Sequence, residues 1–137
     1  MTLKQKIRSH CLQLLNDKIH ELENTLKGLG ESASNDTKSS AGDKHETGRA
    51  MIHIEQETIT KQLNDALEQK ALLEKTEGRL IKTNKGYIFL AVPIGKIIVE
   101  GTTVMAISPG SPLGMKLAVL KVNESAEING VNYFVES

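Results

Sequence analysis

The chain has 137 residues, enough for one ordinary domain or two very small ones. Hydrophobic residues make up 39% and aromatic residues 3%, with no tryptophan, so the core must consist of aliphatic side chains. Residues 1–76 carry 11 Lys/Arg against 12 Asp/Glu, and residues 77–137 carry 6 against 5. This balance argues against a protein that binds DNA independently by neutralising many phosphates.

Cys11 is the only cysteine, so no disulfide framework or cysteine-based zinc site is expected, and a reducing compartment fits best. Its leucine neighbours predict a buried, unreactive thiol. The N-terminal sequence MTLKQKIRSH lacks the apolar segment of a signal peptide, and no run reaches the roughly 18 apolar residues that a membrane span needs. We therefore expect a cytoplasmic protein without a membrane partner.

Residues 3–28 are predicted to form one long helix. Its apolar residues recur at steps of three and four, which is the pattern of the buried seam of a coiled coil. Gly28 and Gly30 are poor helix residues and good C-caps, so we expect the helix to end near them. The seam consists of Leu12, Leu15, Ile19, Leu22, Leu26 and Leu29.

Residues 30–45 are small and polar, which predicts a loop. A second periodic segment starts near Glu46, although Gln56 and Lys70 interrupt its apolar stripe. Neither helix can bury its stripe alone, so the two should fold back on each other. We thus predict an antiparallel coiled-coil finger over residues 1–77, with the 30–45 loop at its tip. The interrupted stripe argues against self-pairing, so we expect a monomer.

Residues 78–137 are predicted to form a small antiparallel β domain with one short helix, giving an α+β fold. The apolar period changes to two, with β-branched residues and glycine or proline breaks. Ser111 can cap a helix over 111–117, with Pro112 at its first position. The Asn129-Gly130 pair predicts the type I′ turn of a hairpin. Other strands are expected at 86–92, 96–100 and 103–108.

Asp43 and Glu46 form an acid pair three residues apart in the predicted connection. One interpretation is structural, because an Asp followed three residues later by a Glu often starts a helix. The other is chemical, because two carboxylates can supply oxygens to a hydrated Mg²⁺ whose remaining ligands are waters and substrate oxygens. Such a pair binds the ion weakly, so it becomes useful at a site that already holds another metal.

Two stretches resemble the Gre-type transcript-cleavage factors, bacterial transcription elongation factors in which a coiled-coil finger precedes a small FKBP-like domain. The stretch GDKHE, residues 42–46, is similar to the family's tip motif Gly-Asp-Leu-x-Glu-Asn. The stretch ISPGSPLGMKL, residues 107–117, is similar to the family's Ile-Ser-x-x-Ser-Pro-hydrophobic-small-x-x-Leu. The two motifs and the elements between them cover nearly the whole chain.

The resemblance implies an accessory protein of RNA polymerase that is not itself an enzyme. The small domain, with Ser111 and Pro112 on its docking surface, would bind at the polymerase secondary channel. The finger would carry Asp43 and Glu46 to the active centre. There they would help to retain a second Mg²⁺, shared with the polymerase and not held stably by this chain alone, for hydrolysis of a backtracked transcript.

The tip departs from the family pattern. Lys44 replaces the family's Leu, and Thr47-Gly48-Arg49-Ala50 replaces Asn-Ala-Glu-Tyr. The positive charges of Lys44 and Arg49 can steer the tip toward phosphate groups, including those of nascent RNA, or can compete with Mg²⁺ for the acids. The C-terminal part is also shorter than the family's domain, and Asn123-Glu124 replaces the family's Gly-Asp turn.

Two other functions stay open. In one, the same docking makes the chain a channel occluder that inhibits or modulates transcription. In the other, the chain is a coiled-coil scaffold or adaptor, and the tip acids are only a helix cap. The four histidines show no metal-binding spacing, and His45 is read as a solvated tip residue.

Overall fold

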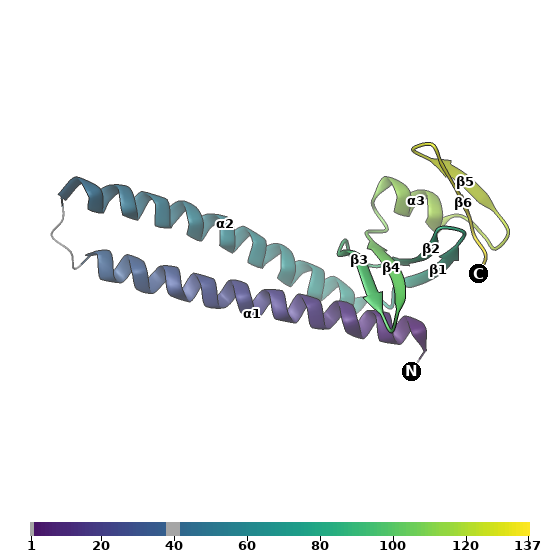
Figure 1. Cartoon of the computed structure of the whole chain (residues 1–137), viewed down its shortest axis with the longest axis horizontal. Helices are drawn as coiled ribbons and strands as arrows, with labels where there is room; N and C mark the ends of the chain where they lie inside the picture. Colours follow the sequence, from purple (N-terminus) through teal and green to yellow (C-terminus); the bar gives the residue numbers. More distant parts are fainter. Residues whose placement is uncertain (1, 38–41) are drawn as a thin grey trace. The chain divides into compact units, whose positions relative to one another are not determined.

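Two long helices packed together precede a small β domain with one short helix, so the predicted α+β class is confirmed (Figure 1). The computed structural model describes the backbone of residues 2–37 and 42–137, and the side chains of residues 2–31 and 50–137. The chain divides into two compact units. We call them the mixed unit (Met1–Gln13 with Gln69–Ser137) and the helical unit (Leu14–Glu68).

The helical unit contains most of α1 (Leu3–Thr37) and α2 (Gly42–Lys75), which lie side by side and antiparallel (Figure 1). The predicted seam is buried in part: Leu15, Ile19 and Leu22 are at most 7% exposed, and its other three leucines are half-buried. Ala66 of α2 is also buried. A small side chain at such a position lets the two helix backbones approach each other closely.

The predicted end of the first helix near Gly28 is wrong, because α1 continues to Thr37. Neither Gly28 nor Gly30 has the positive φ of a helix-ending glycine, so both sit in the helix as ordinary residues. A glycine inside a helix costs only about 1 kcal/mol relative to alanine, which the helix pairing can offset. Since α2 begins at Gly42, residues 30–37 and 42–45 of the predicted loop are helical, and residues 38–41 lie outside the described residues.

The mixed unit contains a four-stranded sheet in the order β1-β2-β4-β3. The pairs β1–β2 and β3–β4 are antiparallel, whereas β2 and β4 are parallel, so the sheet is not purely antiparallel as predicted. Strand β1 was not predicted from the sequence. The bounds are β1 (Arg79–Thr83), β2 (Gly86–Leu90), β3 (Gly95–Val99) and β4 (Thr102–Ile107).

One face of this sheet is covered by α3 (Pro112–Ala118) and by the hairpin of β5 (Ser125–Ile128) and β6 (Val131–Phe134). The hydrophobic core between them consists of Ile81, Ile88, Leu90, Leu117, Ile128 and Val135. Side chains of the opposite face, such as Phe89 and Val104, are fully buried, as are Ile7, Cys11 and Leu73 from the helix ends of the same unit.

Within residues 2–37 and 42–137, three residues other than glycine adopt the left-handed conformation, each at a turn. Asn129 and Gly130 have φ of 52° and 78° and join β5 to β6, as the sequence predicts for a type I′ turn. Glu100 precedes Gly101 in a second such turn, between β3 and β4, with φ of 49° and 79°. Asn123 has φ of 72°, so it adopts the conformation that glycine favours.

Candidate functional site

The predicted tip residues Asp43, Lys44, Glu46 and Arg49 lie in the first two turns of α2, and their side chains lie outside the described residues. The part of the expected loop that carries the acid pair is therefore the start of a helix. In that helix Asp43 and Glu46 are separated by about 4.5 Å of axial rise. Negative side chains in a first turn interact favourably with the helix dipole, so both interpretations of the acid pair stay open.

The predicted docking residues Ser111 and Pro112 form the start of α3. Ser111 is its N-cap, because the Gly114 N–H donates to Ser111 Oγ at 3.0 Å. The Ser111 hydroxyl also donates to the backbone oxygen of Ser108 at 2.7 Å. The predicted cap is thus confirmed. Both hydrogen bonds use the Ser111 hydroxyl, whereas the Pro112 side chain is exposed.

We call residues 107–117 the Ser-Pro motif. Three more of its small or apolar positions also have structural explanations. A Cβ atom at Gly114 would overlap the backbone oxygen of Ser108 and come within 3.1 Å of the Pro109 Cα. Leu117 is fully buried in the core. Ser108 Oγ accepts the Gly110 N–H at 3.1 Å. The motif therefore specifies a tight loop and a helix start, and Pro112 is one of its exposed residues.

A cavity of about 400 Å³ opens beside this motif. Ser108, Ser111, Pro112 and Asn129 contribute to its lining, and the remaining lining residues are apolar or glycine. No charged side chain lines the cavity. The arrangement suits contact with an uncharged surface better than binding of a phosphate or a metal ion.

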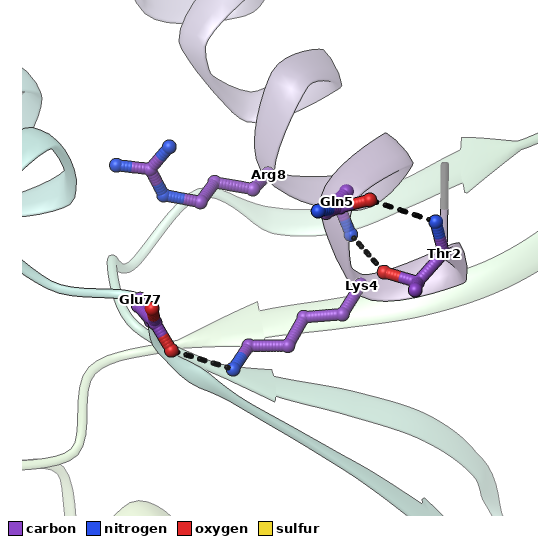
Figure 2. A pocket seen from close by; sticks show the side chains of 5 residues that line it. All are labelled: Thr2, Lys4, Gln5, Arg8 and Glu77. Carbon is purple, nitrogen blue, oxygen red and sulfur yellow. Dashed lines mark hydrogen bonds and ion pairs between the residues drawn. The ribbon is translucent and has the colours of Figure 1, made fainter.

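A second cavity, of about 440 Å³, lies where the helix ends of the mixed unit meet (Figure 2). Lys4 Nζ lies 3.7 Å from a Glu77 carboxylate oxygen. Thr2 and Gln5 bond to each other reciprocally, through the Thr2 N–H to Gln5 Oε1 and the Gln5 N–H to Thr2 Oγ1. These polar groups already have intramolecular partners, so we assign the cavity no ligand.

Arg8, which also lines this cavity, binds the C-terminal end of α2. Its Nη2 donates to the backbone oxygens of Leu73 at 2.6 Å and Glu74 at 3.4 Å, and its Nε donates to that of Thr76 at 3.3 Å. The last carbonyls of a helix lack intrahelical donors, and a cation favours the negative end of the helix dipole. Arg8 therefore caps α2. This role of Arg8 could not be predicted from a local sequence pattern, because its hydrogen-bond partners lie 65 or more positions away along the chain.

Cys11 is fully buried, as predicted, and burial raises the pKa of its thiol to about 11. The thiol is therefore protonated at neutral pH, which makes it a poor nucleophile. Among residues 2–31 and 50–137, no three His, Cys, Asp or Glu side chains gather as a metal site. None of the described helices is long and apolar enough to cross a membrane.

No protein-family model, curated protein or solved structure matches the chain. The Gre resemblance therefore depends on the two motifs and on the order of the elements that contain them.

Proposed function

We propose that the protein is a Gre-like accessory factor of RNA polymerase. It binds near the secondary channel and supplies Asp43 and Glu46 to a second Mg²⁺ during cleavage of backtracked RNA. The observation that supports this proposal is the order of elements: two long packed helices, an acid pair where the second begins, and then a small β domain with the Ser-Pro motif.

The helical unit has dimensions that suit the delivery of acids to a distant site. From Leu14 to Thr37, α1 rises about 35 Å at ~1.5 Å per residue. Because α2 begins at Gly42, the acid pair belongs to the end of this unit where α1 finishes. A paired helix is stiffer than a loop, so it can hold that end at a defined distance.

The chemistry assigned to the acids requires a metal that the polymerase already holds. Two carboxylates occupy a minority of the octahedral positions of Mg²⁺, so waters and RNA phosphate oxygens must fill the others. In a two-metal site the second ion helps to orient the attacking water and to stabilise charge on the phosphate. Asp43 and Glu46 would raise the occupancy of that ion without performing the reaction themselves.

The test uses halted polymerase complexes with backtracked RNA, to which the full chain is added while 3′-end cleavage is followed. We expect the wild type to stimulate cleavage and Asp43→Asn/Glu46→Gln to bind polymerase without stimulating it. The matched control is Asp65→Asn/Glu68→Gln, an exposed acid pair with the same spacing in α2, which should stimulate like the wild type. Equal stimulation by the Asp43/Glu46 variant, or none by the wild type, would contradict the mechanism.

Pro112 tests the docking surface separately from the tip. We expect Pro112→Ala to weaken polymerase binding and to change the free energy of unfolding by less than about 0.5 kcal/mol, because the side chain is exposed. Ser111→Ala should instead cost about 1 kcal/mol through loss of the cap. Unchanged affinity of Pro112→Ala would remove this residue from the docking surface.

A second candidate function is occlusion of the channel, which the charges of Lys44 and Arg49 favour. If these cations hold the acids in ion pairs, the tip blocks nucleotide entry and recruits no metal. The factor then inhibits nucleotide addition without stimulating cleavage, and Lys44→Leu/Arg49→Glu gains cleavage activity. Cleavage by the wild type at ordinary Mg²⁺ concentrations would reject this candidate.

A further inference from the structure

The two edges of the four-stranded sheet differ. At the β1 edge, Thr83 forms a bridge with Val135, and Lys82 exchanges backbone hydrogen bonds with Glu136 and Ser137. The C-terminal residues therefore cover β1. At the other edge, β4 is the only partner of β3 among the described residues.

The register of the β3–β4 hairpin determines which backbone groups of β3 face outward. The turn at Glu100-Gly101 has two residues, so the pair that closes it, Val99 and Thr102, exchanges hydrogen bonds. Bonded and non-bonded pairs alternate along an antiparallel ladder. Lys96 and Ile98 are then the non-bonded residues, and their N–H and C=O groups point away from β4 to the open side. Within the described part of the chain, no backbone hydrogen bond outside the ladder involves them.

The side chains beside this edge form an exposed apolar strip. Lys96 pairs with Met105 and Ile98 with Thr103, and cross-strand pairs project from the same face of a sheet. Ile98 is 59% exposed and Met105 is 40% exposed, because α3 and the β5–β6 hairpin pack on the core at the β1–β2 side of that face. Open backbone groups and exposed apolar side chains thus occur together.

A cavity of about 210 Å³ adjoins the strip. Met105, Leu113 and Tyr133 provide much of its apolar lining, and Lys85 and Lys96 are its charged lining residues. No acidic side chain lines it. The surface beside β3 is therefore apolar with positive charge at its border.

We propose that the open edge of β3 binds an extended segment of a partner protein by adding it as a fifth strand. The segment carries an acidic residue opposite Lys96 and an apolar residue opposite Ile98, two positions apart on one face. Edge backbone groups provide affinity in this type of recognition, and alternate side chains provide specificity. A large apolar side chain of the segment can also reach the cavity next to Met105.

The charge of Lys96 argues for a different protein rather than a second copy as the occupant. Antiparallel pairing of two β3 strands would bring the Lys96 ammonium groups of both copies close to each other, and a lysine on an edge strand is a common barrier to such pairing. An acid opposite Lys96 converts that repulsion into attraction. Because the surface belongs to the mixed unit and uses neither tip acid, the inference does not depend on the proposed function.

The test is an NMR titration of the ¹⁵N-labelled full chain with the capped synthetic peptide Ser-Thr-Ile-Thr-Glu-Thr-Ser. When it pairs antiparallel to β3, its Glu lies opposite Lys96 and its Ile lies opposite Ile98. We expect chemical-shift changes centred on Lys96, Ile98 and Met105, and slower hydrogen exchange at the Lys96 and Ile98 amides. The same peptide with Lys in place of Glu should bind about five- to tenfold more weakly. A peptide N-methylated at Glu and Ile keeps both side chains but loses the donors that face β3, so it should not bind.

Variants of the chain complete the test. Lys96→Glu should reverse the preference between the Glu and Lys peptides, whereas Lys116→Glu, on exposed α3, should leave it unchanged. Shifts centred elsewhere, equal binding of the N-methylated peptide, or no binding would overturn the inference. Concentration-dependent shifts at Lys96 and Ile98 without peptide would overturn it in favour of self-pairing.

Discussion

The two units bury their apolar side chains in different ways. Of the 20 buried apolar residues among those whose side chains are described, 16 lie in the mixed unit and four in the helical unit. The mixed unit buries side chains on both faces of a sheet, whereas the helical unit buries one narrow stripe. In the helical unit, Met51, Ile54 and Leu67 are each at least 44% exposed. The two units should therefore differ in the free energy of unfolding that the same truncation removes.

The strongest test of this difference compares the same truncation in both units. Leu117→Ala removes a fully buried side chain from the mixed unit, and we expect a loss of about 3–5 kcal/mol in the free energy of unfolding. Leu22→Ala removes a side chain that is 7% exposed, where the helices can partly close the space, so a loss of about 2 kcal/mol is expected. Urea unfolding measures both values, and equal losses would remove the distinction.

Cys11 gives the mixed unit a specific pH dependence. Its thiol has a pKa of about 11 when folded, against 9.0 for an unperturbed thiol, so the folded state retains a proton that the unfolded state loses. Stability from this group is complete below pH 9 and falls as the pH rises from 9 to 11, by about 2–3 kcal/mol. Urea unfolding at a series of pH values should show that the free energy of unfolding falls more steeply with pH in the wild type than in Cys11→Ala. Parallel curves would contradict the expectation.

Gly114 and Gly110 provide a matched pair in the Ser-Pro loop. Gly114→Ala should cost about 1–3 kcal/mol, because the added methyl group meets the Ser108 backbone oxygen. Gly110→Ala should cost less, since its Cβ would meet only Ser108 Oγ, at an ordinary 3.6 Å. Thermal unfolding of the two variants gives the comparison. A neutral Gly114→Ala would show that the loop is not held against α3.

The smallest expected effect has the opposite sign and lies in the helical unit. Gly28→Ala and Gly30→Ala should each stabilise α1 by about 0.5–1 kcal/mol, because no atom lies within 4 Å of the added methyl group and neither φ is positive. Hydrogen exchange of the α1 amides measures the effect. Faster exchange in either variant would indicate that these glycines interrupt the helix after all.

The elements that could be predicted from the sequence are those set by neighbours in the chain. The Ser111 cap and the Asn129-Gly130 turn each follow from a short pattern, and both are confirmed. The predicted seam is confirmed in part, since three of its six positions, Leu15, Ile19 and Leu22, are buried. The predicted end of α1 near Gly28 is wrong, because a glycine lowers helix propensity but still forms its backbone hydrogen bonds. This local preference is smaller than the stabilisation that α1 gains by packing against α2.

Pairings between distant segments could not be predicted. The parallel β2–β4 pair and the covered β1 edge depend on which strands meet, and strand order is not encoded in any one stretch. The Ser-Pro motif indicated a helix start correctly, but the close approach of Gly114 to Ser108 appears only in three dimensions. For the same reason the open edge at Lys96 and Ile98 has no sequence signature, and the acid pair stays a prediction based on its motif.

The hydrogen bonds of Arg8 bring together two points of the chain that lie 65 positions apart in the sequence. The chain leaves the mixed unit after Gln13 and re-enters it at Gln69, so the helical unit is topologically an insertion. Deleting the same number of whole heptads from α1 and from α2 within that insertion should therefore leave the fold of the mixed unit intact. The length of the helical unit can therefore be changed without redesigning the mixed unit.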